Sequence, residues 1–193
     1  SGADAVYLGA KDFSARRNAE NFNISDLKTV AEYCHIRNVK VYLTLNILIK
    51  DNEFADAVSL ANAAYNAGVD GVIIQDLGLA RVLHTLLPEL PLHASTQMSV
   101  HSVSALPILK ELGFTQVVLA REMSLGDIAE FCKKANEMGI IVEVFVHGAL
   151  CMSVSGQCYF SAMLGRRSGN RGTCAQPCRL PYRMDGGKNG HPL

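Results

Sequence analysis

Short, almost entirely apolar runs recur along this chain, separated by longer stretches of mixed polarity. They are rich in Val, Ile, Leu and Ala, and they lie within 5–9, 40–46, 69–76, 91–99, 115–122 and 140–146. Runs of this kind are typical of strands that are buried on both faces, as in a parallel sheet covered by helices. From the whole alternation we predict about seven parallel strands.

The stretches between the runs carry apolar residues at helical spacing. In 52–67 the apolar side chains recur every three or four positions, and Gly68 follows as a stop signal. The same reasoning predicts helices at 27–37, 77–87, 100–112 and 125–138, the last with Ser124 as its N-cap. Strand–helix units of about 25 residues predict an α/β fold.

Polar residues gather where the predicted strands end. They are Asn46, Gln75, Asp76, Gln97, Arg121, Glu122 and His147. A doubly wound sheet and a TIM barrel both fit the alternation, but a barrel collects all strand ends at one mouth, where its chemistry takes place. The G-x-G-x-x-G signature of a dinucleotide fold is missing after the first run. The barrel is therefore favoured.

A complete TIM barrel has eight strands, so about seven predict an incomplete one. We expect a partial TIM-like barrel over 1–147, and over 148–193 a loop rich in Cys and Arg that leads into the remaining chain. The chain begins without Met and enters an apolar run within a few residues, which we interpret as the start of a piece of a longer protein. A partner subunit or self-association would then complete the barrel.

Alternation along the last predicted strand indicates which of its side chains face the inside of the barrel. Glu143, Phe145 and His147 fall on one face, and the valines between them fall on the other. A carboxylate inside a barrel needs a partner, and Arg121 on the neighbouring strand is the natural candidate. This pair is either structural or part of a substrate site. The candidate catalytic residues are Asn46, Gln97, Arg121, Glu122, Glu143 and His147.

The composition is that of an ordinary globular protein. The 193 residues are 49% hydrophobic and 19% charged, with a formal net charge of zero, which argues against wholesale coating of nucleic acid. There is no leader-like start and no apolar run near 18 residues, so we expect no membrane segment and a cytoplasmic location. Local charge differs from the total, because 144–184 contains no acidic residue.

Four cysteines in this acid-free stretch carry the most informative spacing, C-x6-C-x15-C-x3-C. They are Cys151, Cys158, Cys174 and Cys178. Disulfides suit a secreted protein, and zinc usually takes two tight knuckles. An iron–sulfur cluster tolerates wider gaps because its irons are separate corners of a cube. Cys151 activated by His147 is a further alternative, but it leaves three cysteines unexplained. The cluster is favoured among these.

Arginines accompany the cysteines. Arg166, Arg167, Arg171 and Arg179 lie in the same stretch. A fully Cys-ligated 4Fe–4S cluster is anionic, so nearby cations help to set its potential. On the residues alone, these arginines are either counter-charges for a cluster or a surface for an anionic ligand.

Specific motifs across the whole chain resemble one known family. The segments EVFVHGALC, GQC and GRRSGNRGTCAQPCRLPY, together with GADAVYLG, VYLTLN, GVIIQD, LHASTQ and GFTQVVLARE, are similar to peptidase family U32. Its members are collagenase-like proteins, many of which hydroxylate RNA. The resemblance implies a TIM barrel with a strand preceding Ser1, and a 4Fe–4S cluster on the four cysteines. It also implies a tRNA, rRNA or ubiquinone-precursor substrate, with prephenate as a possible oxygen donor.

The resemblance leaves three hypotheses of function. The first is an iron–sulfur enzyme that hydroxylates a tRNA or rRNA base, with phosphates on Arg166, Arg167, Arg171 and Arg179 and the base splayed into the barrel mouth. The second is a peptidase, although H-E-x-x-H and G-x-S-x-G are missing from the sequence. The third is an iron–sulfur scaffold subunit of a hydroxylase complex.

Overall fold

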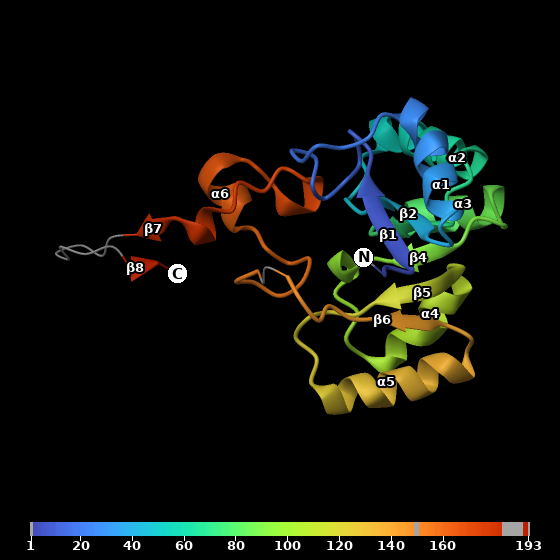
Figure 1. Ribbon diagram of the computed structural model, residues 1–193. Coiled ribbons are helices and arrows are strands. Elements are labelled where there is room, and N and C mark those ends of the chain that lie inside the picture. Colours follow the sequence, from blue (N-terminus) through green and yellow to red (C-terminus); the bar gives the residue numbers. More distant parts are fainter. Residues whose placement is uncertain (1, 149–150, 183–190, 193) are drawn as a thin grey trace.

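A curved parallel sheet forms the centre of the molecule. The computed structural model describes residues 2–148, 151–182 and 191–192 (Figure 1). Six strands pair in chain order, from β1 at one edge to β6 at the other, and every pair is parallel. Their bounds are β1 Ala5–Gly9, β2 Lys40–Leu45, β3 Gly71–Ile74, β4 Leu92–Ala94, β5 Phe114–Val118 and β6 Ile141–Glu143.

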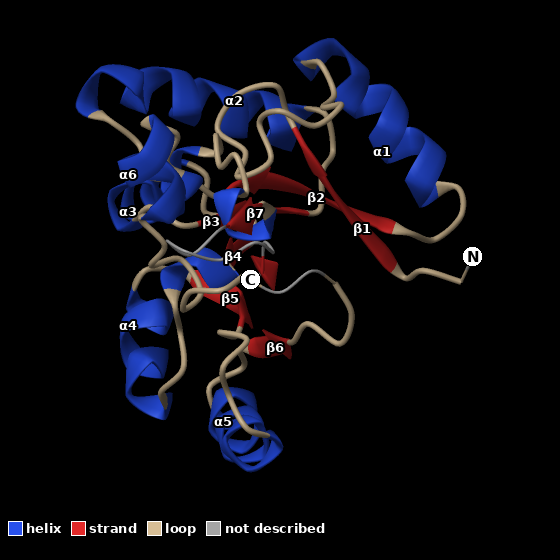
Figure 2. Ribbon diagram, turned by 90° about the vertical axis from the view of Figure 1, so that its left-hand side faces the viewer, coloured by secondary structure: helices blue, strands red, loops and turns tan. Residues whose placement is uncertain are grey.

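Helices cover the outer, convex face of this sheet. They are α1 Leu27–His35, α2 Phe54–Asn66, α3 Leu77–Leu86, α4 Leu106–Glu111 and α5 Leu125–Glu137. Seen from the carboxyl ends of the strands, the five helices follow the sheet in an arc (Figure 2). The apolar core lies between the two layers and includes Leu43, Val72 and Phe131, which are fully buried. This is one half of a TIM-like barrel.

The strand count and the last strand differ from expectation. The sheet has six strands among the described residues, not about seven, because each apolar run supplies one strand and no other described segment joins them. The last strand ends at Glu143 instead of continuing to 146. Beyond it Val146 is 93% exposed, so the chain has left the sheet before it reaches His147.

The remainder of the chain projects from the carboxyl ends of the strands (Figure 1). It contains α6 Phe160–Gly165, two short 3-10 turns at Gly169–Arg171 and Pro177–Arg179, and a small antiparallel pair, β7 Pro181–Tyr182 with β8 His191–Pro192. We call residues 151–182 the cysteine segment. The predicted boundary at 147/148 stays a prediction, and residues 149–150, 183–190 and 193 lie outside the described part. No helix in that part is long and apolar enough to cross a bilayer.

Candidate functional site

Ser155 anchors the first half of the cysteine segment to the end of β5. It is fully buried. Its N–H and hydroxyl donate to Oε1 of Glu122 at 2.9 and 3.2 Å, and its Oγ accepts from the backbone N–H and the Nε of Arg121 at 3.3 and 3.1 Å. The hydroxyl of Ser99 donates to the Ser155 carbonyl. Two predicted catalytic residues, Arg121 and Glu122, thus hold the cysteine segment in place.

Gly156 continues this contact with the backbone that follows β4. Its φ is +76°, and an added Cβ would lie 2.0 Å from the carbonyl oxygen of Gln97. Gln97 belongs to a 3-10 turn, Thr96–Met98, and does not lie in a strand as expected. The same carbonyl accepts a hydrogen bond of 3.3 Å from Nε2 of Gln75. The backbone of Gln97 therefore joins the strand ends to the cysteine segment.

Arg171 anchors the second half of the segment to the loop after β2. Its guanidinium donates to the Leu48 carbonyl and forms an ion pair of 2.5 Å with Glu53. The hydrogen bond from Arg171 is the main reason that the pKa of Glu53 lies below its usual range. Next to it, a Cβ on Gly172 would lie 2.1 Å from the Ser14 carbonyl oxygen. Arg171 is thus engaged by the barrel, and its contact with RNA stays a prediction.

Asn46 stabilises a loop at the mouth. Its Oδ1 accepts from the backbone N–H of Ala15 at 2.9 Å, which ties the end of β2 to the loop after β1. Asp76 has a comparable role, because its carboxylate caps α3 by accepting from the N–H of Leu79 at 2.9 Å and also accepts from Ile49 at 3.1 Å. Both polar strand ends therefore hold the mouth loops in place.

The four cysteines of the segment are free thiols. Cys151 and Cys174 are exposed, whereas Cys158 and Cys178 are half-buried. The backbone N–H of Gln176 donates to the Cys174 sulfur at 3.3 Å. Within residues 2–148, 151–182 and 191–192, no three His, Cys, Asp or Glu side chains lie close enough to hold one metal ion. Cys34 and Cys132, on α1 and α5, are also free and half-buried.

The remaining arginines of the segment lie at its surface. Arg166 ends α6 in the left-handed conformation, with φ +57°. Arg167 donates from Nε to the Thr173 carbonyl at 2.9 Å. Both are exposed, as is Arg179. Tyr159, at the start of α6, is 66% exposed. An aromatic ring and several guanidinium groups are thus presented to solvent by one small lobe.

Glu143 lies on the concave face of the half-barrel, but its partner is not Arg121. Nε2 of Gln116 donates to its Oε2 at 2.6 Å. Burial raises the pKa of Glu143, and the Gln116 hydrogen bond opposes this in part. The predicted Glu143–Arg121 pair is wrong because Arg121 is bound to Ser155. His147, expected on the same face as Glu143, is exposed beyond the end of β6.

Alternation in the sequence already puts His93 and Ser95 on one face of their strand and leaves open whether His93 is solvated or catalytic. The polar residues of the concave face that sequence reasoning missed are Tyr42, Thr44 and Gln116. His93 is only 4% exposed, and its ring stands edge-on to Tyr42 with centroids 4.4 Å apart. Desolvation lowers the pKa of His93 to about 4, with a smaller contribution from Lys40. The signal that would have found the missed residues is the same period-two alternation: Thr44 lies between Leu43 and Leu45, which both belong to the helix-facing core.

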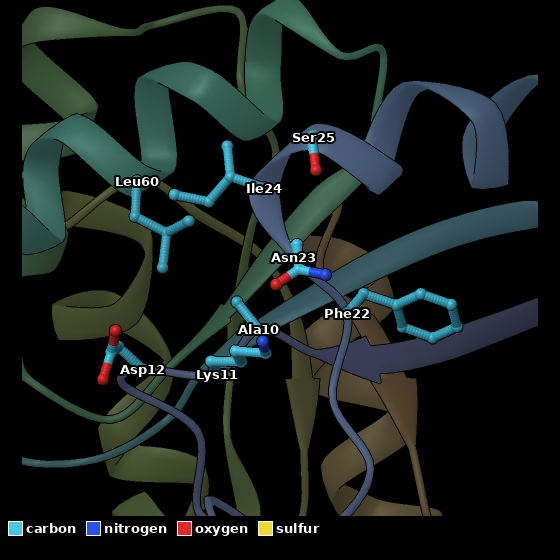
Figure 3. Close-up of a pocket in the computed structure, with 8 residues that line it drawn as sticks. All are labelled: Ala10, Lys11, Asp12, Phe22, Asn23, Ile24, Ser25 and Leu60. Atoms are coloured by element: carbon cyan, nitrogen blue, oxygen red, sulfur yellow. The ribbon is translucent and has the colours of Figure 1, made fainter.

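A hollow of about 270 Å³ lies away from these residues, where β1 ends. Figure 3 shows its lining side chains, among them Lys11, Asp12 and Asn23, with Leu60 of α2 above them. None of the predicted site residues lines it. The candidate site is therefore the mouth and concave face of the half-barrel, together with the cysteine segment.

Comparison with known proteins decides the family. The sequence model of peptidase family U32 matches residues 1–191. This chain belongs to peptidase family U32. Among solved structures, a U32 peptidase superposes with a TM-score of 0.56 at 14% identity, covering 74% of this chain and 60% of that one. At that identity the likeness supports the half-barrel fold alone.

Curated U32 relatives match nearly the whole chain. The 23S rRNA 5-hydroxycytidine synthase of Escherichia coli is 42% identical over 95% of this chain and 27% of its own length. The tRNA hydroxylation protein P of the same species is 34% identical over 97% of this chain and 41% of its own length. A collagenase of Porphyromonas gingivalis is 37% identical over 94% of this chain and 45% of its own length. The chain thus spans between about a quarter and a half of these relatives.

Proposed function

We propose that this U32 chain is part of an enzyme that hydroxylates a base of tRNA or rRNA. The observation that carries the proposal is the placement of the cysteine segment. Ser155 and Arg171 attach it to the carboxyl ends of strands on both sides of the half-barrel, which is where TIM-barrel enzymes have their active sites. Names of relatives support the same reaction, since they include an rRNA 5-hydroxycytidine synthase and a tRNA hydroxylation protein.

We assign the four thiols of the cysteine segment to a 4Fe–4S cluster. The residue types fit, because Cys151, Cys158, Cys174 and Cys178 are free thiols and no carboxylate in 144–184 competes with them. No three of these four, all of which the structure describes, lie close enough together to hold one metal ion, so the thiols must converge when the cluster binds. The N–H that Gln176 directs at the Cys174 sulfur is the kind of hydrogen bond that tunes such clusters. When bound, the cluster supplies one-electron transfer. The protein's part is to hold these thiols beside the mouth.

Arg166, Arg167 and Arg179 would bind RNA phosphates, with Tyr159 as a surface on which an unpaired base can stack. Guanidinium groups bind phosphate in a bidentate way, and exposed aromatic rings stack on single-stranded bases. The target base must leave its stack to reach a barrel mouth. These contacts would position the base above the ends of β3 to β6. An RNA substrate also implies a cytoplasmic location.

Hydroxylation needs an oxygen donor. Replacing a ring C–H by C–OH inserts one oxygen atom and removes two electrons from the base, so each turnover consumes one equivalent of a donor that accepts those electrons. We propose prephenate for this role, as the family resemblance implies. A partner subunit, or further chain that completes the barrel, belongs to the same proposal.

Peptide hydrolysis is the competing function, because one relative is named a collagenase. It would need His147 to activate Cys151. Among the described side chains, no hydrogen bond joins the His147 ring to the Cys151 sulfur, and both residues are exposed. A water-excluding nucleophilic site is not formed there. RNA hydroxylation is therefore the function that the geometry supports better.

The test is nucleoside mass spectrometry of RNA from a strain that lacks the full-length protein. We expect one hydroxylated nucleoside to disappear and to return with the wild-type gene but not with a Cys174→Ser variant. Protein purified without oxygen should contain iron and sulfide. Unchanged nucleosides together with thiol-dependent cleavage of peptides would favour the peptidase. Iron without any modified nucleoside, unless a second protein is added, would favour the scaffold subunit.

A further inference from the structure

The loop that follows β1 brings a second group of basic side chains to the mouth of the half-barrel. We call residues 10–23 the β1 loop. Arg16 and Arg17 are both exposed on it, and neither belongs to the site described above. The loop begins at the carboxyl end of β1, which is the end of the strands where the loops of TIM barrels bind substrates. These two side chains are therefore in a position to contact a ligand at the mouth.

Hydrogen bonds fix the backbone that carries these two arginines. Ser14 is 3% exposed, and its Oγ accepts from the N–H of Arg16 at 3.2 Å. The side-chain amide of Asn21 donates to the carbonyl oxygens of Arg16 and Arg17 at 3.1 and 3.2 Å. Both guanidinium groups are thus presented from an ordered backbone, which lowers the entropic cost of binding a ligand.

The β1 loop also lies against the second half of the cysteine segment (Figure 1). A Cβ added to Gly172 would lie 2.1 Å from the Ser14 carbonyl oxygen and 3.3 Å from the Cβ of Arg17. The next residue, Thr173, accepts the hydrogen bond from Nε of Arg167. Arg17 and Arg167 thus contact adjacent residues of one backbone stretch. Basic side chains of the barrel and of the cysteine segment therefore form one continuous group, which we call the arginine strip: Arg16, Arg17, Arg166 and Arg167.

Acidic side chains neutralise only part of this strip. Arg17 forms an ion pair of 3.1 Å with Asp12, and both side chains are more than half exposed. Exposed ion pairs contribute little to stability, so an anionic ligand can replace Asp12. Glu20 is exposed on the same loop. Arg16 forms no ion pair with an acidic side chain of the described residues. The strip therefore keeps an excess of positive charge for a ligand.

We propose that Arg16 and Arg17 bind backbone phosphates of the same RNA strand that contacts Arg166 and Arg167. The inference rests on the proposed RNA substrate and adds the barrel's own part of its binding surface. An RNA strand presents phosphates in a row, and guanidinium groups bind phosphate in a bidentate way. RNA would then cross the junction between the barrel and the cysteine segment.

An acidic protein is the weaker match for the β1 loop. Protein interfaces have an apolar core inside their polar rim. Residues 15–20 read Ala-Arg-Arg-Asn-Ala-Glu and contain no large apolar side chain. A surface made of guanidinium and amide groups instead suits the phosphates and sugars of a nucleic-acid backbone.

The salt dependence of RNA binding tests the proposal. The experiment uses the full-length protein and a fluorescently labelled single-stranded oligouridylate. Arg16→Ala should lower the slope of log affinity against log salt by about 0.7, and an Arg16→Ala, Arg17→Ala double variant should lower it by about 1.4. Adding Arg166→Ala and Arg167→Ala should bring the loss to about 2.8, because all four arginines bind one strand. Melting temperatures should stay at the wild-type value, since the substituted side chains are exposed. Arg81→Ala, on the convex side at α3, is the matched control.

Asp12 allows a test in the opposite direction. Asp12→Asn removes the acidic partner of Arg17 and should raise RNA affinity severalfold at low salt, with the gain shrinking as salt screens the charges. A gain in affinity does not result from loss of structure. Asp56→Asn, which removes the same charge from an exposed position on α2, should leave RNA affinity unchanged. Equal affinities of wild type and Asp12→Asn would contradict the proposal.

The outcomes of these binding experiments separate the inference from the proposed function. Wild-type slopes in the Arg16→Ala, Arg17→Ala variant would overturn the inference, even if the protein hydroxylates RNA. If the slopes fall as expected but no hydroxylated nucleoside is found, the proposed function fails and the RNA-binding surface stands. A labelled poly-glutamate chain that binds as tightly as the oligouridylate and competes with it would overturn the inference in favour of an acidic protein partner.

Discussion

His93 makes a specific prediction about acid stability. Its pKa in the folded protein is about 4, against 6.5 for the free side chain, because burial disfavours the charged ring. A lowered folded-state pKa means that the stabilisation is fully present above pH 6.5 and is lost as the pH falls toward 4. We expect the preferential protonation of His93 in the unfolded state to lower the free energy of unfolding by on the order of 3 kcal/mol at most between pH 6.5 and pH 4. Urea unfolding of wild type and His93→Phe across the window measures it.

The comparison with the variant isolates His93 from other titrating groups. Glu143 acts in the opposite sense, because its raised pKa gives stability at low pH that is lost as the pH rises through the folded value. Glu53 has a lowered pKa, so its contribution to the stability of the protein is lost as the pH falls. Both contributions are common to the two proteins. If the two pH curves run parallel, His93 is not buried in its neutral form and the prediction fails.

Ser155 should control the reactivity of two thiols. It lies between Cys151 and Cys158, and its bonds to Glu122 hold that stretch on the barrel. We expect Ser155→Ala to raise the alkylation rates of both cysteines severalfold in the reduced, iron-free protein, because removing one partner of a buried network costs about 1–3 kcal/mol. Peptide mass spectrometry after timed alkylation gives the rates. Cys34 and Cys132 serve as internal controls, and equal acceleration of all four would indicate general unfolding instead.

Side-chain faces could be read from the sequence, but side-chain partners could not. Alternation correctly placed Glu143 inside the half-barrel. It could not show that Arg121 bonds to Ser155, which is 34 positions away in a loop without periodicity. Gln116 was overlooked as the Glu143 partner because it lies inside an apolar run rather than at a strand end. Long-range contacts made by loops leave no pattern in a single sequence.

Elements that bury one face were predictable because burial imposes a period. Five of the six strands and all five convex-face helices lie within the predicted ranges, and β5 begins one residue earlier, at Phe114. Ser124 caps α5 by accepting from the N–H of Asp127 at 3.2 Å. Boundaries were less predictable. The helix expected at 100–112 begins only at Leu106, since Pro107 stands in its first turn and a 3-10 turn, Val103–Ala105, precedes it. The last strand was predicted to continue to 146 because apolar residues follow Glu143, but β6 ends at Glu143.

Gly156 is one of two glycines at which the cysteine segment packs too closely on the barrel to leave room for a side chain. Alanine there would place Cβ 2.0 Å from the Gln97 carbonyl oxygen and would also strain the backbone at φ +76°. We expect Gly156→Ala to destabilise the local contact by more than about 1 kcal/mol and to speed amide exchange at Ser155–Gln157. Hydrogen exchange with mass spectrometry measures this. Gly165→Ala is the matched control, because nothing lies within 4 Å of its added Cβ; similar exchange in both variants would contradict the docking.

At the scale of the whole molecule, charge is distributed unevenly over a neutral total. The formal net charge is zero, yet 144–184 contains no acidic residue, so the barrel must carry the compensating negative charge. Arg171 uses part of the positive charge internally, in its ion pair with Glu53. Arg166 and Arg167 remain exposed on the lobe that projects from the strand ends. The molecule is thus polarised, with its cationic side at the candidate site.

This polarity predicts how RNA binding responds to salt. Each phosphate bound by an arginine adds about 0.7 to the slope of log affinity against log salt for a single strand. An Arg166→Ala, Arg167→Ala double variant should therefore lower the slope by about 1.4 and weaken binding at low salt without changing the melting temperature. Arg81→Ala, on the convex side with only a long 3.9 Å contact to Glu111, should leave the slope unchanged. Fluorescence anisotropy with a labelled target RNA at several salt concentrations measures both. Equal slopes for wild type and the double variant would mean that the phosphates bind elsewhere and that these arginines do not form the RNA surface.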